Sequence, residues 1–311
     1  MRAIAPAVLA LTRRIQCMRV RGSENIPASG PFLLVSNHTC HLDALSVAVP
    51  VYEAGRVPRI AGRADLFTVP VLGWALRRLD QIPIYRSDVA HVPRDGGTPA
   101  SSLRAMSAVL EAGGGVIVFP ESTFTRDPSG WPMRAKTGVA RLALAHPEAA
   151  VVPVAHWGNE AMLDPWSNRV DWRRIGRART TLDVRIGEPL DLARFRGREV
   201  THELLTELTE AVMAAITQEL EVLRADDVAA GLGPRDPRWD RRRDGDPFER
   251  RALQRSEQLK KRLDRKAARG KWRKATVEPR AMAYAAAASG GVALALAVAR
   301  KVAARRAGKA R

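Results

Sequence analysis

The sequence predicts an α/β protein with a largely parallel central sheet flanked by helices. Five short apolar runs bounded by Gly, Pro or Asn are typical of buried strands, and helix-like stretches follow them. Strands that alternate with helices form a parallel sheet covered on both faces. The expected strands are residues 31–36, 81–85, 115–119, 150–155 and 180–186, and the expected helices are residues 43–49, 70–79, 98–112, 134–146 and 200–223.

The residues at the element ends justify this order. The first apolar run, PFLLVS, stops at Asn37, and Asp43 opens the first helical stretch. Thr98 stands directly before a proline and is a favourable helix start, as is Lys136 with the threonine after it. The runs GVIVF, AVVPVA and TTLDVRI are the expected later strands, before the long helix that closes the body.

Charge divides the chain into unequal parts. The net charge is +18, and residues 225–311 hold 24 Lys and Arg against 10 Asp and Glu. We therefore expect a near-neutral globular body over 1–224, a charged linker or helical segment over 225–280, and an Ala-rich apolar stretch with a basic, partly disordered tail over 281–311. A basic extension favours an anionic partner, either membrane lipid or nucleic acid.

Two apolar segments near the ends bear on the membrane. Residues 5–11 (APAVLAL) lack the features of a secretion signal and are expected to form a first helix that packs on the body, with a helix lying shallowly on the membrane as the alternative. Residues 281–299 contain no charge but are mostly Ala and Gly, with basic residues on both sides. Spanning the membrane, lying on its surface and avoiding it all remain open for this stretch.

His38 and Asp43 are the candidate catalytic pair. They lie in a turn at the carboxyl end of an expected strand, which is where open α/β sheets bind their ligands. A histidine removes protons near neutral pH, and a carboxylate orients its ring and stabilises the imidazolium. This spacing alone is a weak signal, because a turn histidine beside a helix-capping aspartate would look the same.

Three further motifs strengthen this hypothesis. LDQIPIYRSD (79–88) ends a strand with Arg86, and GVIVFPESTFTRD (115–127) ends one with Glu121, Ser122 and Thr123, followed by Arg126. VVPVAHWG (151–158) is an apolar strand that contains a proline. Together with NHTCHLD and in this order, the motifs resemble the four blocks of the glycerolipid acyltransferases, especially bacterial 1-acylglycerol-3-phosphate acyltransferases, and the resemblance covers about residues 15–220.

The resemblance implies roles for these residues. His38 would be the general base and Asp43 its orienting partner, so that the acceptor hydroxyl attacks an acyl thioester without an acyl-enzyme. Arg86 and the turn of Glu121, Ser122 and Thr123 would form the site for the acceptor phosphate, with Glu121 holding an arginine or the turn rather than the phosphate. Arg126 would stand in for the motif arginine that this chain replaces. No cofactor and no metal is expected beyond an acyl-coenzyme A or acyl-carrier-protein thioester as co-substrate.

The chain departs from the family pattern at three positions. Cys40 stands where the family often has serine, Ser122 where it has glycine, and Phe124 where it has arginine, with Arg126 two places further on. Cys40 is expected to fill the serine position, although a thiolate nucleophile is the alternative. His41 competes as the base but lacks the family spacing to Asp43.

The functions expected from the sequence differ in acceptor and in chemistry. Acyl transfer to 1-acylglycerol 3-phosphate, giving phosphatidic acid, is favoured, and glycerol 3-phosphate or a glycolipid is the alternative acceptor. A non-catalytic protein that binds membrane or nucleic acid is the third hypothesis, but the basic tail lacks interleaved aromatic residues for stacking on bases. We expect a peripheral protein on the cytoplasmic face of an anionic membrane, with a carrier protein as a further partner.

Overall fold

The computed structural model describes residues 10, 12–13, 16–69, 72–85, 96–164, 170–171, 173–175 and 180–248. Seven strands in this part form one sheet in the order β1-β7-β6-β2-β5-β3-β4. Their bounds are β1 Cys17–Arg21, β2 Phe32–Ser36, β3 Pro58–Arg63, β4 Ile82–Ile84, β5 Gly115–Val118, β6 Ala150–Trp157 and β7 Thr181–Ile186. The pairing of β6 with β7 is antiparallel and the other described pairings of these strands are parallel, so the predicted fold class is confirmed.

All five predicted strands are present, but β1 and β3 escaped prediction. β1 (CMRVR) pairs only with β7 at one edge of the sheet, and its residues are half-buried or exposed. β3 (PRIAGR) contains two arginines, and each of its residues is half-buried. Neither strand is apolar enough to stand out as a hydrophobic run, because neither is enclosed on both faces.

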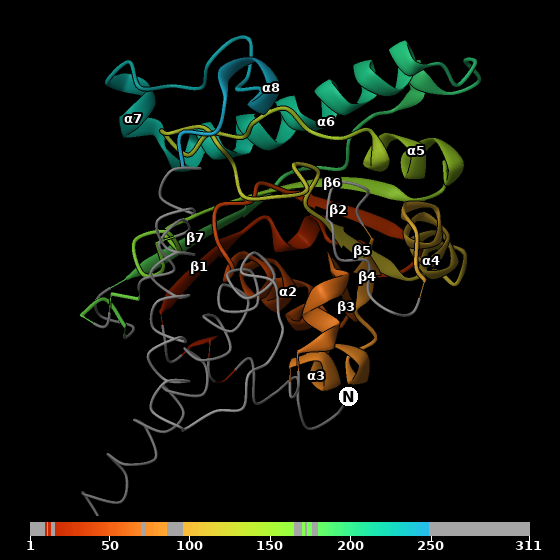
Figure 1. Cartoon of the computed structure of the whole chain (residues 1–311), viewed down its shortest axis with the longest axis horizontal. Helices are drawn as coiled ribbons and strands as arrows, with labels where there is room; N and C mark the ends of the chain where they lie inside the picture. The colour runs from red at the N-terminus through yellow and green to blue at the C-terminus, as the bar shows by residue number, and fades with distance from the viewer. Residues whose placement is uncertain are drawn as a thin grey trace, which may run out of the picture.

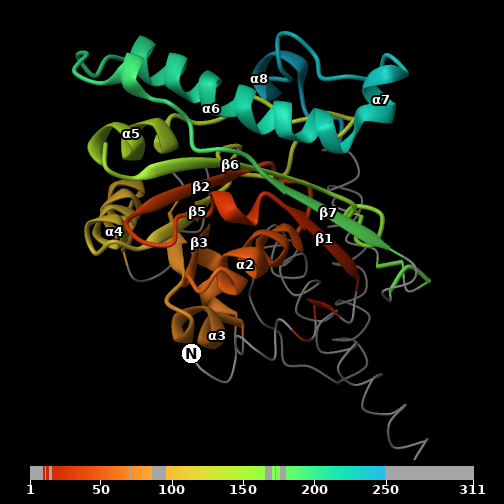
Figure 2. The ribbon, with the colours of Figure 1, turned by 180° about the vertical axis from the view of Figure 1, so that it is seen from behind.

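Helices cover both faces of the sheet. Their bounds are α2 Asp43–Glu53, α3 Leu72–Arg78, α4 Pro99–Glu111, α5 Gly138–Ala145, α6 His202–Leu223, α7 Ala225–Ala229 and α8 Arg241–Asp244, with 3-10 turns at Ser23–Asn25, Ala64–Thr68 and Ala193–Phe195. In Figures 1 and 2, α5 and α6 lie over one face of the sheet and α2 over the opposite face.

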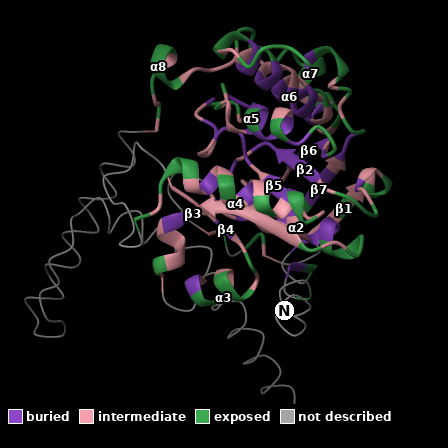
Figure 3. Ribbon diagram, turned by 90° about the vertical axis from the view of Figure 1, so that its right-hand side faces the viewer, coloured by how far each residue is buried: buried purple, intermediate pink, exposed green. Residues whose placement is uncertain are grey.

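Alternation along β2 divides the core between these faces. Leu33 and Val35 pack in the cluster that includes α4, α5 and α6, whereas Phe32 and Leu34 pack in the cluster that includes α2. Every residue of β2 is buried, as Figure 3 shows for the centre of the sheet. β2 is therefore held from both faces and from both edges, which gives the turn after it a rigid base.

The helix starts largely follow their capping residues. Thr98 caps α4 with a capping box, and the Thr201 side chain accepts a hydrogen bond from the Leu204 N–H at the start of α6. The helix expected from residue 134 begins only at Gly138. Residues before it are engaged elsewhere, because the Lys136 N–H donates to the Pro120 carbonyl at 3.0 Å and the Arg134 N–H to the Trp239 carbonyl at 2.8 Å.

Residues 225–248 pack against the body, so its contacts continue beyond the boundary expected at residue 224. The Trp131 indole donates to the Leu232 carbonyl at 2.8 Å, and Arg238 donates to the Thr217 hydroxyl at 2.7 Å. Figure 1 shows this segment, in blue, beside α6. The division of the rest of the tail stays a prediction, because residues 249–311 lie outside the described residues.

Within the described ranges, no helix has the length and apolar character needed to cross a bilayer. The candidate segment 281–299, the charged stretch 249–269 and nearly all of residues 5–11 fall outside those ranges.

Candidate active site

Three neighbouring strands carry the candidate site at their carboxyl ends. β2 lies between β5 and β6 and is parallel to both. The turn with His38 therefore meets the turn after β5, which holds Glu121 to Arg126, and the turn after β6, which holds Asn159. The sheet order explains how motifs more than 80 residues apart become neighbours.

His38 and Asp43 are in contact, as their spacing predicted. Their atoms Nδ1 and Oδ2 are 3.0 Å apart, and the Asp43 side chain is fully buried. The N–H groups of Thr39 and Cys40 donate to the same Oδ2 at 2.5 and 2.7 Å. The carboxylate thus closes the turn between β2 and α2 and faces the His38 ring.

The electrostatics keep Asp43 ionised. Burial alone would raise the pKa of this carboxyl. The charge interactions with His156 and His38 and the hydrogen bonds from His38 and the Cys40 N–H outweigh burial and hold the pKa well below its usual range. An ionised Asp43 accepts the Nδ1–H of His38, which leaves Nε2 as the ring nitrogen with a lone pair. That is the arrangement a general base requires.

Two aromatic rings hold the His38 imidazole. Phe119 stacks on it with centroids 4.3 Å apart, and Phe124 meets it edge-on at 4.6 Å. Phe124, which replaces the arginine of the family pattern, thus packs against the base. His41 lies edge-on to the same Phe124 ring at 4.6 Å, whereas the Asp43 carboxylate contacts His38 and His156. The geometry favours His38 over His41 as the base.

Cys40 has the surroundings of a packing residue. Its side chain is fully buried, its Sγ donates to Asp43 Oδ1 at 3.4 Å, and burial raises the pKa of its thiol. A thiolate nucleophile needs a lowered pKa and access to the substrate. This environment favours a small residue in the serine position over covalent catalysis.

Glu121 joins the His38 turn to a second loop. It is 3% exposed and accepts one hydrogen bond from the His38 N–H and one from the Met133 N–H, both at 2.9 Å. Burial raises its pKa to about 8, although the two N–H groups oppose this. Of the two roles expected for Glu121, these contacts favour holding the turn.

Ser122 and Thr123 form a tight turn beside the base. Ser122 adopts φ 61°, in the left-handed region where the family pattern has glycine, and its N–H donates to the Phe119 carbonyl at 3.0 Å. Thr125 continues the loop and donates its N–H to the His38 carbonyl at 2.8 Å. The loop therefore lies against the His38 backbone.

Of the two candidate arginines, Arg126 lies within the described residues and Arg86 does not. Arg126 forms an ion pair with Asp246 at 2.8 Å and donates to the Phe124 carbonyl at 3.1 Å. Asp246 belongs to the segment after α8, so the C-terminal part of the described chain reaches the loop that was expected to bind phosphate. Arg86 lies outside the described residues, and its role stays a prediction.

A buried polar network behind the pair was not predicted. His156 Nε2 donates to the Asn37 carbonyl at 2.9 Å, and the Asn37 side chain exchanges two hydrogen bonds of 3.0 Å with the His156 backbone. Burial lowers the pKa of His156. Asn159 contacts Asp43 directly at 2.9 Å. The available signal was a run of polar residues after an apolar strand at the same sheet edge.

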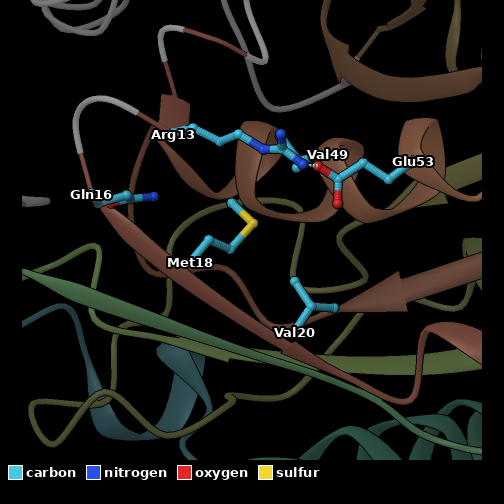
Figure 4. A pocket seen from close by; sticks show the side chains of 6 residues that line it. All are labelled: Arg13, Gln16, Met18, Val20, Val49 and Glu53. Carbon is cyan, nitrogen blue, oxygen red and sulfur yellow. Dashed lines mark hydrogen bonds and ion pairs between the residues drawn. The ribbon is translucent and has the colours of Figure 1, made fainter. Parts of the chain in front are cut away.

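A pocket in the described part of the chain lies away from the His38 and Asp43 site. It has a volume of about 270 Å³ and lies between β1 and α2, with Met18, Val20 and Val49 as apolar walls. Figure 4 shows that Arg13 and Glu53 reach toward each other across it, and Gln16 lies beside them. None of its lining residues belongs to the His38 turn.

Comparison with known proteins finds similarity to acyltransferases over part of the chain. The acyltransferase family model matches residues 17–157, which include the His38 turn and the turn after β5. A chloroplastic 1-acyl-sn-glycerol-3-phosphate acyltransferase of Arabidopsis thaliana is 29% identical over 131 residues, which cover 40% of this chain and 34% of that protein. A second one, of Brassica napus, is 30% identical over 128 residues, which cover 39% of this chain and 34% of that protein.

The alignments thus span about a third of the length of these curated relatives. Among solved structures, the 1-acyl-sn-glycerophosphate acyltransferase of Thermotoga maritima is 24% identical with a TM-score of 0.48, covering 70% of this chain and 79% of that one. Residues 17–157 therefore match the acyltransferase family model, and this part of the chain is similar to the 1-acyl-sn-glycerol-3-phosphate acyltransferases.

Proposed function

We propose that this chain transfers an acyl group from a thioester to the free hydroxyl of 1-acylglycerol 3-phosphate and so forms phosphatidic acid. The contact between His38 Nδ1 and the buried Asp43 Oδ2, at 3.0 Å, is the observation that carries the proposal. The similarity to two plant 1-acyl-sn-glycerol-3-phosphate acyltransferases supports the same acceptor.

The proposed reaction is a single displacement. His38 Nε2 takes the proton of the acceptor hydroxyl, and the oxygen attacks the thioester carbonyl carbon. The carbon–sulfur bond breaks as the new ester bond forms, and the leaving thiolate receives a proton. Asp43 holds the ring and stabilises the imidazolium that forms between these steps.

The acceptor phosphate would bind at the turn after β5. Backbone N–H groups and the hydroxyls of Ser122 and Thr123 suit a phosphate, and Arg86 and Arg126 would supply charge. Arg126 is paired with Asp246, so phosphate binding at this arginine would have to displace or share that carboxylate. The donor is a coenzyme A or carrier-protein thioester, since both present the same reacting carbonyl.

The basic tail would attach the protein to the anionic face of a membrane, where both acceptor and product reside. A polybasic segment gains about 1 kcal/mol for each Lys or Arg close to an anionic leaflet. The cytoplasmic leaflet is the proposed location.

The test is an acyl-transfer assay of the purified full chain against a panel of acceptors. The panel holds 1-acylglycerol 3-phosphate, glycerol 3-phosphate, a neutral monoacylglycerol and a glycolipid, each with acyl-coenzyme A and with acyl carrier protein, and mass spectrometry identifies the product. Preferred formation of phosphatidic acid supports the proposal. If the protein prefers another acceptor, that acceptor becomes the proposed substrate. If no acceptor receives an acyl group, the result favours a non-catalytic binding protein.

A further inference from the structure

The turn after β6 contributes a side chain that contacts Asp43. Asn159 is fully buried and lies two residues beyond the end of the family match at residue 157. Its Nδ2 donates to Asp43 Oδ1 at 2.9 Å and to Ser46 Oγ at 2.7 Å. One amide group thereby links β6, the Asp43 carboxylate and the first turn of α2.

Chemistry fixes which end of the Asn159 amide faces Asp43. An ionised carboxylate can only accept hydrogen bonds, so the amide nitrogen must point at it. Ser46 Oγ donates to the Leu42 carbonyl at 3.3 Å and is left to accept from Asn159. Both amide hydrogens of Asn159 are therefore used on these two oxygens.

The amide oxygen of Asn159 is unsatisfied. It is buried and has no hydrogen-bond partner in the described part of the chain. A buried acceptor without a partner costs stability, so such a group calls for an explanation. The amide nitrogen at Asp43 provides one: the residue is suited to hold the carboxylate rather than to stabilise the fold.

The two oxygens of Asp43 have separate tasks. Oδ2 accepts the backbone N–H groups of Thr39 and Cys40 and faces His38. Oδ1 accepts from Asn159, with longer contacts of 3.3 Å to the Thr39 hydroxyl and 3.4 Å to the Cys40 thiol. Because a carboxylate can rotate about its Cβ–Cγ bond, a donor on Oδ1 acts together with the two N–H groups on Oδ2 to fix where Oδ2 points.

His156 does not duplicate this function. Its Nε2 lies 3.6 Å from Asp43 Oδ2, beyond hydrogen-bond distance, and is 2.9 Å from the Asn37 carbonyl. Asn159 is therefore the side chain other than His38 with a short hydrogen bond to Asp43 in the described structure.

We propose that Asn159 is a positioning residue for acyl transfer, acting through Asp43 to keep Oδ2 on the Nδ1–H of His38. The proposal rests on the function given above, since it assigns His38 as the base. Asn159 touches neither reacting group, so its removal should lower kcat and leave KM for the acceptor nearly unchanged.

Two substitutions separate hydrogen-bond donation from packing. Asn159→Leu keeps similar size without a donor, and Asn159→Asp keeps the shape but replaces the donor by an oxygen. Thr209→Val on α6 is the matched control, because it removes a buried hydroxyl that donates to the Leu205 carbonyl at 2.6 Å. Ser46→Ala is a milder variant that removes the second partner of Asn159 and leaves Asn159 itself intact.

Steady-state kinetics with acyl-coenzyme A and 1-acylglycerol 3-phosphate provide the first readout. A small displacement of a catalytic group costs on the order of 10–100-fold in rate, so kcat should fall by about this factor in both Asn159 variants. Ser46→Ala should show a smaller fall, and Thr209→Val should keep the wild-type kcat.

The downfield proton resonance of the His38 Nδ1–H provides a second readout that needs no substrate. It should be present in the wild-type chain and in Thr209→Val, and should shift or broaden away in the Asn159 variants. Wild-type kcat and an unchanged resonance in folded Asn159→Leu would overturn the proposal, as would a rise in KM at constant kcat. If both Asn159 variants fail to fold, the kcat and the His38 resonance of Ser46→Ala decide. Wild-type values of both would overturn the proposal. If the wild-type chain transfers no acyl group, the proposed function fails, and the resonance alone decides whether Asn159 positions the pair.

Discussion

Arg126 and Asp246 form an ion pair with 2.8 Å between Nε and Oδ2, although 120 residues separate them in the sequence. Both side chains are mostly buried, at 13% and 8% exposure. The pair connects the turn that follows β5 with the segment that follows α8. An acidic side chain is thus paired with the arginine that was expected to stand in for the motif arginine at the acceptor phosphate.

The first prediction is that Asp246 competes with this phosphate. Asp246→Asn should lower the apparent KM for 1-acylglycerol 3-phosphate, because the neutral amide holds Arg126 less firmly. Arg126→Ala should raise it, since a hydrogen bond to a charged group contributes about 1.5–3 kcal/mol. Steady-state kinetics with the phosphorylated acceptor and with a neutral monoacylglycerol measure the effect.

Asp240→Asn is the control for this prediction, because it disrupts the nearby but more exposed pair with Arg134. It should leave the apparent KM unchanged. Equal KM values in the wild type, Asp246→Asn and Arg126→Ala would place the phosphate elsewhere.

The second prediction concerns backbone strain at Ser122. A non-glycine residue at φ 61° is strained, and replacement by glycine should stabilise the chain by up to about 1 kcal/mol. Ser122→Gly restores the family residue and should keep acyl transfer. Ser129→Gly is the control. Ser129 does not have a positive φ, so replacing it by glycine relieves no backbone strain. Urea unfolding compares the two, and a loss of stability in Ser122→Gly would contradict the strain argument.

The third prediction is a pH dependence of stability caused by Glu121. Its pKa rises from an ordinary 4.5 to about 8 in the fold, so between these pH values the unfolded chain has lost the proton that the folded chain keeps. The contribution of Glu121 to the free energy of unfolding is therefore fully present below pH 4.5. It is lost as pH rises toward 8, by about 1.4 kcal/mol per pH unit.

Glu121→Gln should remove this slope, because glutamine does not titrate. Urea unfolding from pH 5 to pH 8 measures the free energy of unfolding, with the exposed Glu111→Gln on α4 as the control that keeps the wild-type slope. An identical pH dependence in wild type and Glu121→Gln would show that Glu121 is ionised in the fold.

The fourth prediction separates the body from the tail. A chain ending at residue 248 should fold and keep acyl transfer, whereas one ending at residue 224 should be less stable, because it loses the hydrogen bonds of Leu232 and Trp239 with the body. Thermal unfolding and the acyl-transfer assay test this. Equal melting temperatures for the two truncated chains would contradict a structural role for residues 225–248.

The chain ending at residue 248 should also bind anionic vesicles more weakly than the full chain, most clearly at low salt. Co-sedimentation with neutral and with anionic vesicles over a salt series measures this. Equal binding by both chains would exclude a membrane role for the tail. Binding that persists at high salt on neutral lipid would favour apolar insertion of residues 281–299.

The sequence predicted what is local or apolar. Fully buried strands such as β2 are continuous apolar runs, and the contact of His38 with Asp43 spans only five residues. β1 and β3 lacked this signal because they lie at or near the sheet edges and contain arginines. The family resemblance supplied the turn after β5, but not the partner of Arg126.

What the sequence could not show depends on long-range contacts. Asn159 meets Asp43 from 116 residues away because β6 pairs with β2, and the polar residues around Asn159 do not indicate which side chain it contacts. The segment after residue 224 was expected to be a linker, since it has little apolar periodicity. It is held instead by polar contacts, such as the Trp131 indole to the Leu232 carbonyl, which leave no hydrophobic pattern.

The rate of acyl transfer by His38→Ala tests the central claim most directly. A general base contributes about 10²–10⁴-fold to the rate, so kcat should fall by this factor while the melting temperature stays close to that of the wild type. The fall in kcat should be smaller for Asp43→Asn, because His38 remains but its ring is no longer held by the carboxylate. His202→Ala, at the exposed start of α6, is the matched control and should transfer at the wild-type rate. Near-normal turnover by folded His38→Ala, together with loss of turnover in His41→Ala, would contradict the assignment of His38 as the base.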